Sequence, residues 1–490
     1  MKLRALIVLA TLTNLFCSAA ELPRSAPEAQ GISSSAVLSF VESADKSIDS
    51  MHSVMILRHG HVIAEGWWTP YAAQTPHVLW SLSKSFTSTA VGIAIAEGKL
   101  SVDDEVLKFF PDDAPAEPSK NLKLMRVSDL LRMSTGHASE PPHSAEQPWA
   151  KTFLAHPVTF KPGTHFLYNS MGTYMLSAIV QKATGQSARE YLRPRLFEPL
   201  GIENPSWESS PQGISAGGWG LHLRTEDIAR FGQLYVQKGL WNGKQLVPRE
   251  WVESASARQT SNGSAPNSDW DQGYGYQFWR CRHNAYRGDG AFGQYCVIMP
   301  DQDAVVVITS GVKNMQSALD LIWTKLLPNM QAAALPPDEE AAKKLALTMK
   351  SLSLKPQEGN STPATLPHKK YVFEANKSKL ESIKLESAEK DGAVTLVAQI
   401  NSKEQRIACG RGTWQKGQAA WSSIPQQPVA ASGAWTAEDT FTVKLSFYET
   451  TYMITVNLKF SGDEVRCNSE WNATFGPTKE GELVGKAGKE

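Results

Sequence analysis

The alternation of hydrophobic and polar positions predicts a mixed helical and strand region at the start of the chain. Serines at 33–35 precede apolar positions at helical spacing, which predicts a helix capped by a serine. Two apolar runs flank His59-Gly60, the pattern of a β-hairpin with its turn at Gly60. Apolar residues over 81–97 cover most of a helix surface and Gly98 follows as a C-terminal cap, so this helix is expected to be buried.

Helical spacing of apolar residues and short apolar runs also predict the elements that follow. Residues 103–164 are rich in Pro, His and Gly and are expected to form a helical, loop-rich region. Elsewhere the pattern predicts helices over 128–132, 171–183, 225–236 and 317–327, and three consecutive strands over 275–279, 292–298 and 304–309. The predicted sheet therefore combines the early hairpin around Gly60 with the three strands over 275–309.

The C-terminal region has a period of two instead. Apolar and polar residues alternate over 441–447 and again over 452–460, which predicts an antiparallel meander. Residues 331–368 contain two proline-rich stretches around a helical pattern at 338–350, and we interpret them as a connector. The predicted fold class is α+β for 21–330, followed by an all-β barrel or sandwich domain over 369–490.

The first twenty residues have the layout of a secretory signal peptide. Lys2 and Arg4 precede a mostly apolar run over 5–16, and Ser18-Ala19-Ala20 follows. The apolar run is shorter than the roughly 18 residues that a membrane span needs. We therefore expect cleavage after Ala20, a secreted or periplasmic protein, and no membrane span.

Export would affect the cysteines. Removal of the signal leaves Cys281, Cys296, Cys409 and Cys467, an even number in an oxidising compartment. Sequence order favours disulfide bonds between the first two and between the last two. Other pairings, and buried free thiols, remain open.

Composition narrows the class of partner. The 490 residues contain 49 basic and 49 acidic side chains, so the chain has no overall charge with which to attract nucleic acid or an acidic membrane. The predicted partner is a small molecule. No His, Cys, Asp or Glu cluster has metal-ligand spacing, and no phosphate-binding glycine loop is evident, so neither a metal nor a cofactor is expected.

The strongest candidate for chemistry is the pair Ser81 and Lys84. Residues three apart share a helix face, which brings a hydroxyl and an amine together at the start of the buried helix. Lys84 could act as a base near pH 7 if burial lowered its pKa by about 3 units. The same spacing occurs at Ser43, Ser310 and Ser387, none of which opens a buried helix. An N-cap serine beside a surface lysine is the alternative.

Two further segments could complete this site. A Pro162-Gly163 turn leads to Tyr168, whose phenol could relay a proton beside the lysine, although a packed tyrosine would give the same pattern. The glycine-rich stretch 287–294 could let a substrate lie against a strand edge, where a backbone N–H near Gly288 or Gly290 would help to hold an oxyanion. A hairpin turn is its alternative interpretation.

Together these motifs resemble the serine hydrolases related to class C β-lactamases, penicillin-binding proteins and their esterase relatives. The motifs are Ser81-x-x-Lys84, Asp129 to Gly136, Tyr168 after its turn, and Gly217-Gly-Trp-Gly-Leu221 before Asp227. The resemblance covers roughly residues 25–330 and implies a β-lactamase-like fold. It also implies that Ser81 is the acylated nucleophile, that Lys84 and Tyr168 act as general base and acid, and that the backbone N–H of Ser81 belongs to the oxyanion hole.

The chain departs from that family pattern in two places. The usual Tyr-x-Asn box is Tyr168-Asn169-Ser170, which puts Ser170 among the candidate substrate-binding residues, and the Lys-Thr-Gly or His-x-Gly box is absent. That box binds the substrate carboxylate in β-lactamases, a role for which Arg287 is a candidate. The pattern is closer to 6-aminohexanoate-dimer hydrolases and carboxylesterases. We therefore expect an exported hydrolase of an ester or amide, the alternatives being a non-catalytic cell-envelope binding protein and a D-alanyl peptidase or β-lactamase.

Overall fold

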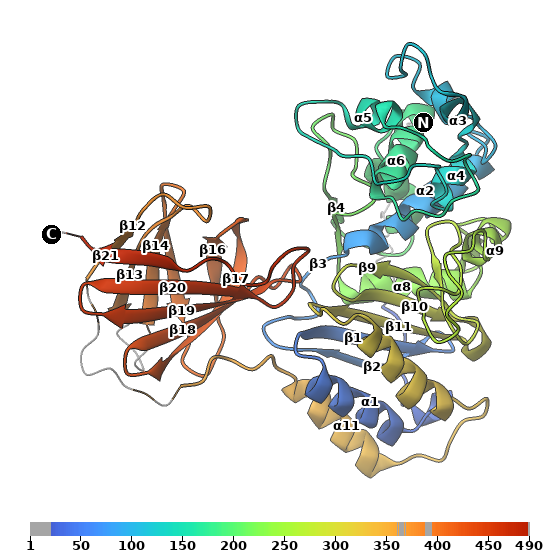
Figure 1. The fold of residues 1–490 in the computed structure, drawn as a ribbon. Helices are drawn as coiled ribbons and strands as arrows, with labels where there is room; N and C mark the ends of the chain where they lie inside the picture. The colour runs from blue at the N-terminus through green and yellow to red at the C-terminus, as the bar shows by residue number, and fades with distance from the viewer. Residues whose placement is uncertain (1–20, 360, 362–366, 368, 388–393, 489–490) are drawn as a thin grey trace, which may run out of the picture.

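The computed structural model describes residues 21–359, 361, 367, 369–387 and 394–488. It contains a six-stranded sheet covered by helices and a ten-stranded sheet near the C-terminus (Figure 1). The expected signal peptide and its cleavage site lie outside the described residues. In the part of the chain that is described, no helix combines the length and the apolar character that crossing a membrane would require.

The six-stranded sheet is antiparallel throughout, with strand order β2-β1-β11-β10-β9-β8. Its first two strands form the expected hairpin at His59-Gly60. Its strands are β1 (Met51–Arg58), β2 (His61–Trp67), β8 (Trp279–Arg280), β9 (Tyr286–Gly290), β10 (Gln294–Met299) and β11 (Ala304–Ser310). Alternate residues of β1 and β10 enter cores on opposite faces, because successive side chains of a strand point to opposite sides.

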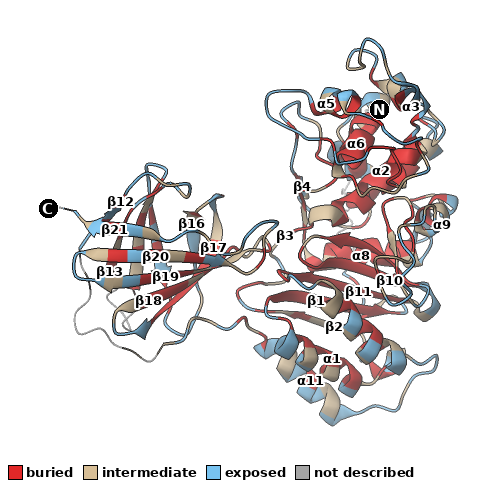
Figure 2. Cartoon of the chain, in the orientation of Figure 1, coloured by how far each residue is buried: buried red, intermediate tan, exposed pale blue. Residues whose placement is uncertain are grey.

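Helices cover both faces of this sheet. One face carries α1 (Ser34–Ser47), α10 (Gln316–Leu321) and α11 (Glu339–Ser351), and the other carries α2 (Ser83–Ala96) and α8 (Thr225–Val236) (Figure 1). Ser33 caps α1 as the sequence predicts, accepting a hydrogen bond from the Ala36 N–H at 3.1 Å. Helix α2 is buried along nearly its whole length, as Figure 2 shows.

A helical region packs beside α2 and supplies much of the larger core. Its central helix, α6, is buried on all sides from Met171 to Val180 and ends at Gly185 in the left-handed conformation, as expected. The helices of the region are α3 (Lys120–Leu124), α4 (Val127–Leu131), α5 (Trp149–Ala155), α6 (Ser170–Thr184), α7 (Ala188–Leu192) and α9 (Arg249–Ser256). Short strands accompany them: β3 (His77–Val78), β4 (Ser206–Trp207), β5 (Leu221–Leu223), β6 (Leu240–Trp241) and β7 (Lys244–Gln245).

The C-terminal sheet is a nearly closed antiparallel barrel, with strand order β15-β14-β13-β12-β21-β20-β19-β18-β17-β16. A bridge between Gly410 and Ser432 brings its two ends together. Its strands are β12 (Tyr371–Phe373), β13 (Leu380–Ser387), β14 (Val394–Ile400), β15 (Lys403–Cys409), β16 (Gln415–Trp421), β17 (Ile424–Ala437), β18 (Thr440–Ser446), β19 (Met453–Ser461), β20 (Glu464–Trp471) and β21 (Leu483–Ala487). The meander predicted from 441–460 is present as β18 and β19.

Loops of the barrel contact the part of the chain that carries the six-stranded sheet, near β3 (Figure 1). The Val78 N–H donates to the Glu449 carbonyl at 2.9 Å, and the Tyr71 hydroxyl donates to the Thr450 carbonyl at 3.1 Å. The Asn472 amide donates to the Gly311 carbonyl at 2.8 Å. These contacts fix the barrel beside the turn that leads into Ser81.

Two expectations differ from the structure. The strand predicted over 275–279 is reduced to Trp279 and Arg280, because Gln277 adopts a left-handed conformation with φ 67° and its side chain binds backbone carbonyls of α4. The expected connector contains α11, which packs against α1 and β2 and belongs spatially to the layer over the sheet.

The expected disulfide bonds are not formed, and the four cysteines of the described residues are free and buried. Cys281 and Cys296 lie in the cores on opposite faces of the six-stranded sheet, which keeps their thiols apart. Cys409 and Cys467 both point into the barrel, but from β15 and β20, which are separated by several strands. Order along the chain therefore misled the prediction.

Candidate active site

Ser81 lies in a single helical turn, η2 (Trp80–Leu82), that connects β3 to α2. The sequence predicts Ser81 as the first residue of the buried helix, and the structure places it one turn earlier, just before α2 begins. Its side chain is partly exposed, whereas Leu82 behind it is fully buried. The hydroxyl is thus presented to solvent from a fixed, buried support.

Lys84 is buried, and its amine is held by three polar groups. Its Nζ lies 2.9 Å from Ser81 Oγ, 3.1 Å from Ser170 Oγ and 2.8 Å from the Gly218 carbonyl oxygen. All three partners are uncharged. Burial lowers the pKa of Lys84 to about 7, although the negative charges of Glu140 and Asp289 partly oppose that shift. A neutral amine can accept the Ser81 proton while its own N–H groups bind Gly218 and Ser170.

The Gly218 carbonyl is a site group that the sequence analysis did not identify. The Thr87 hydroxyl of α2 donates to the Gly217 carbonyl at 2.9 Å, which ties this loop to the helix that carries Lys84. A side chain at Gly218 would meet the backbone of Ser170. The Gly217-Gly218 motif was visible in the sequence, but nothing in its pattern shows that a carbonyl binds the lysine.

Tyr168 lies beside this pair. Lys84 Nζ is 4.8 Å from the centre of the Tyr168 ring, and that ring stacks on Trp279 at 5.2 Å. Burial raises the pKa of Tyr168, and a hydrogen bond with Ser81 only partly offsets this. The phenol therefore keeps its proton at neutral pH and can donate it.

Ser170 begins α6, and Glu140 binds the same end of that helix. The Glu140 carboxylate accepts from the Ser170 N–H at 2.6 Å and from the Met171 N–H at 3.3 Å. A carboxylate is favourable at a helix N-terminus. Glu140 was missed by the sequence analysis because it lies in a loop without periodicity.

Strand β9 brings Gly288 and Gly290 against the turn that holds Ser81. A side chain at Gly288 would overlap Leu82 and Ser85, and one at Gly290 would overlap the Leu79 carbonyl. Strand β8 pairs only with the first two residues of β9, so the backbone from Gly288 to Gly290 forms an open edge. Glycine thus permits the close approach that the sequence analysis anticipated.

Arg287, the candidate for binding a substrate carboxylate, is instead bound by residues of the protein itself. Its guanidinium is fully buried, donates to Asp289 at 2.8 Å and to the Asp269 carbonyl at 2.8 Å, and stacks on Trp270 at 4.3 Å. It also contacts the Cys281 thiol and lies over the Trp279 ring at 5.6 Å. The structure therefore brings Ser81, Lys84, Ser170 and Tyr168 together and places the Arg287 charge in an internal ion pair.

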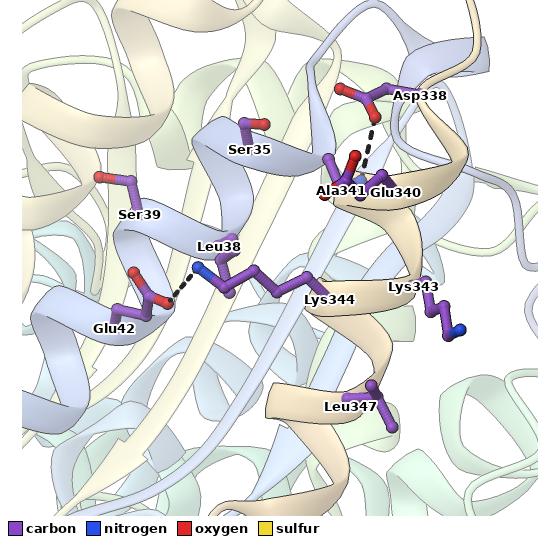
Figure 3. A pocket seen from close by; sticks show the side chains of 10 residues that line it. All are labelled: Ser35, Leu38, Ser39, Glu42, Asp338, Glu340, Ala341, Lys343, Lys344 and Leu347. Atoms are coloured by element: carbon purple, nitrogen blue, oxygen red, sulfur yellow. Dashed lines mark hydrogen bonds and ion pairs between the residues drawn. The ribbon is translucent and has the colours of Figure 1, made fainter.

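Among the described residues, no three His, Cys, Asp or Glu side chains gather as a metal-binding group. A groove of about 650 Å³ lies between α1 and α11, where Lys344 pairs with Glu42 at 3.3 Å (Figure 3). That groove lies over the face of the sheet opposite to Ser81.

Comparison with known proteins gives a consistent result. A family model described as beta-lactamase matches residues 44–349, more than half of the chain. The chain is 28% identical to a 6-aminohexanoate-dimer hydrolase of Paenarthrobacter ureafaciens over 276 residues, 52% of this chain and 70% of the relative. It is 30% identical to the "Putative D-alanyl-D-alanine carboxypeptidase" of Escherichia coli K12 over 148 residues, 26% of this chain and only 34% of that relative.

A solved structure shares the fold. The "Putative 6-aminohexanoate-dimer hydrolase from Bacillus anthracis" superposes with a TM-score of 0.54 at 20% identity, covering 65% of this chain and 90% of its own. The predicted resemblance and fold class are confirmed. The chain belongs to the β-lactamase family of serine hydrolases.

Proposed function

We propose that the protein hydrolyses an ester or an amide through a covalent acyl intermediate on Ser81. The observation that carries this proposal is the 2.9 Å approach of the buried Lys84 amine to Ser81 Oγ, with burial lowering the pKa of Lys84 to about 7. A serine hydroxyl is a weak nucleophile until a neighbouring base takes its proton. Lys84 is suited to be that base at neutral pH.

The first half of the reaction forms the acyl-enzyme. Neutral Lys84 accepts the Ser81 proton as Oγ bonds to the substrate carbonyl carbon, and the carbonyl oxygen becomes an oxyanion. The Ser81 N–H and a backbone N–H at the open edge of β9 would bind that oxyanion. Collapse breaks the bond to the leaving group, which receives a proton from protonated Lys84, either directly or through Tyr168, whose phenolate then takes the Lys84 proton.

The second half returns the enzyme to its starting state. A water molecule gives a proton to the basic group, its oxygen bonds to the acyl carbon, and the bond to Ser81 Oγ breaks. Ser81 regains its proton and the product is a carboxylic acid. Its raised pKa keeps Tyr168 protonated, so the phenol can pass on a proton but is not the base that activates Ser81.

The charges around the site support a substrate without a carboxylate next to the scissile bond. Arg287 is committed to Asp289, and the acidic groups of Glu140 and Asp289 influence Lys84. An incoming carboxylate would be repelled by Glu140 and would gain little from Arg287, whose charge Asp289 balances. This favours an uncharged ester or a linear amide over a β-lactam, and similarity to a 6-aminohexanoate-dimer hydrolase agrees with an amide.

Turnover and labelling of Ser81 variants test the proposal. Ser81→Ala should abolish hydrolysis of short acyl esters and linear amides, and it should also abolish labelling by a fluorophosphonate probe. Ser43→Ala is a matched control, because Ser43 has the same spacing to a lysine but lies on α1. Retained turnover in Ser81→Ala would overturn the assignment. Acylation by penicillin at a rate comparable to the esters would favour a D-alanyl peptidase or β-lactamase instead.

The N-terminal sequence supports export as part of the same proposal. Lys2, Arg4 and the apolar run over 5–16 are those of a cleaved signal. Expression of the full chain in a bacterium should give a secreted or periplasmic product that begins at Glu21. An unprocessed cytoplasmic product would contradict this.

A further inference from the structure

Four aromatic side chains meet beside the nucleophile, two from each part of the molecule. Trp80 precedes Ser81 directly, and Phe292 lies in the turn between β9 and β10. The Trp80 ring lies 5.9 Å from Phe292, 6.2 Å from Tyr452 and 5.3 Å from Phe475, between ring centres. Phe292 and Phe475 are 4.8 Å apart. Tyr452 and Phe475 belong to the barrel.

The backbone of the two hydrolase-side residues is strained. Trp80 has φ 47° and Phe292 has φ 64°, a left-handed conformation that bulky side chains rarely adopt. Such a conformation is unfavourable and persists where the surroundings impose it. Both strained residues direct their rings to the same place, next to Ser81, which points to a use for that arrangement.

The cluster leaves apolar surface open to solvent. Phe475 is 74% exposed although its ring contacts two others, so one side of the ring is covered and the remainder faces outward. Phe292 is 7% exposed, so most of its ring is covered by its neighbours. Exposed apolar surface beside a reactive group is characteristic of a binding site.

Contacts between the barrel and the sheet, and within the barrel, hold the aromatic cluster in place. The Trp80 indole donates to the Thr451 hydroxyl at 3.4 Å, and the Tyr452 ring meets Trp471 edge-on at 5.2 Å. The Asn472 amide donates to carbonyls on both sides of the interface, Gly311 and Thr451, at 2.8 Å each. Phe475 follows three residues after Asn472, so its backbone is anchored close to the site.

The cluster and the Tyr168 ring belong to separate groups of aromatic contacts among the described residues. The described ring contacts of Tyr168 are with Tyr274 and Trp279, which share no contact with the cluster. A leaving group must lie near the donor that protonates it, toward Tyr168 and Lys84. The other substituent of the carbonyl, the acyl group, is then directed toward the cluster.

We propose that Trp80, Phe292, Tyr452 and Phe475 form the binding site for the acyl part of the substrate, and that this part is an apolar or aromatic group. The barrel is then a part of the substrate site, and Phe475 determines acyl specificity. This inference rests on the proposed function, since it requires Ser81 to be acylated.

A comparison of two ester series tests it on the full-length protein. The first series keeps p-nitrophenol as leaving group and varies the acyl group from acetyl to hexanoyl and phenylacetyl. The second keeps acetyl and varies the alcohol. Phe475→Ala should lower kcat/KM for the hexanoyl and phenylacetyl esters about tenfold relative to the acetyl ester. Phe475→Leu should retain most of the preference, and the alcohol series should be unchanged.

Val372→Ala provides the matched control, because Val372 is an exposed apolar residue of the barrel on β12. It should leave both series unchanged. An equal loss for all acyl groups in Phe475→Ala, or a loss that follows the alcohol, would overturn the inference. The rate at which Ser81 is labelled by methyl and octyl fluorophosphonates gives the same comparison without turnover.

The two proposals fail in different ways. If Ser81→Ala retained hydrolysis or labelling, the acyl-Ser81 mechanism would fall, and the specificity inference with it. If hydrolysis depended on Ser81 but Phe475→Ala kept the wild-type acyl preference, only the role of the aromatic cluster would be wrong.

Discussion

At the residue scale, the decisive feature is a buried lysine without an ion-pair partner of its own. Lys84 is bound by two hydroxyl groups and one carbonyl, none of which stabilises a positive charge as a carboxylate would. Burial, which no such partner offsets, lowers the pKa of Lys84 from 10.5 to about 7. A lysine on an exposed helix would remain protonated, and Ser81 would have no base.

The pH dependence of hydrolysis should reflect this pKa. The ratio kcat/KM should rise with pH through about 7, because only the neutral amine of Lys84 accepts a proton. Glu140→Gln removes a negative charge that favours protonated Lys84, so the acid limb should move to lower pH. Initial rates from pH 5 to 9 measure the wild-type profile and its shift in Glu140→Gln. Glu146→Gln, in the same loop, is the control, and an identical shift in it would contradict the argument.

Replacing Lys84 should lower activity without lowering the stability of the fold near pH 7. Lys84→Met should lower kcat/KM by about 10³-fold. The unfolded chain binds the Lys84 proton up to pH 10.5 and the folded chain only up to about 7, so wild-type stability rises with pH in that interval. Lys84→Met should remove this rise, and at pH 7 and below it should be at least as stable as wild type. Urea unfolding at several pH values checks this, and an unchanged slope would refute it.

At the element scale, the position of β9 depends on two glycines. Gly288 and Gly290 let the strand edge pass directly beside the turn that holds Ser81, where a side chain would collide with Leu79, Leu82 or Ser85. The geometry of the site is thus fixed by backbone packing as well as by the reactive side chains.

Adding a methyl group to this strand should therefore impair the site. Gly290→Ala should destabilise the protein by about 1 to 3 kcal/mol and should lower kcat more than it raises KM, because β9 must move from η2. Gly417→Ala, on β16, meets no neighbouring atom and should leave both quantities unchanged. Thermal unfolding and steady-state kinetics give the two readouts. Wild-type kinetics in Gly290→Ala would show that β9 is not part of the site.

Sequence periodicity, with the cap and turn residues, was sufficient to predict several of the longer elements. Helices α1, α6 and α8 and the hairpin of β1 and β2 follow from spacing. Strand β9 does not follow from spacing. Its glycines, Gly288 and Gly290, alternate with the charged residues Arg287 and Asp289, which are buried as an ion pair. The pattern of the Ser81, Lys84 and Tyr168 motifs was sufficient to group those residues. The Gly218 carbonyl and Glu140 contribute through tertiary placement, which no local pattern records.

At the scale of the whole molecule, a chain of neutral histidines lies where the barrel meets the sheet. His52 Nδ1 and His77 Nε2 are 3.0 Å apart, and His77 Nδ1 donates to the Val78 carbonyl at 2.8 Å. The N–H of Val78 in turn binds the barrel at Glu449. A few loop contacts of this kind produce no periodic pattern in the sequence. The alternation of residues therefore predicted the barrel but not its position beside the active site.

Acid should destabilise this arrangement. Burial lowers the pKa of His77 from 6.5 to about 4, so the unfolded chain takes up a proton before the folded chain does as pH falls. Stability should decrease between about pH 6.5 and 4, by about 3 kcal/mol from His77 alone. His77→Asn should reduce the slope of the unfolding free energy in this range. An unaltered slope would show that His77 contributes nothing to it.

Direct detection of the acyl-enzyme tests the central claim most sharply. The protein is mixed with an activated ester that deacylates slowly, quenched in acid within seconds, and examined by intact-mass spectrometry and peptide mapping. A mass increase equal to one acyl group, located on the peptide that contains Ser81 and absent from Ser81→Ala, is predicted. Turnover without any adduct, or an adduct on another residue that persists in Ser81→Ala, would contradict catalysis through acyl-Ser81.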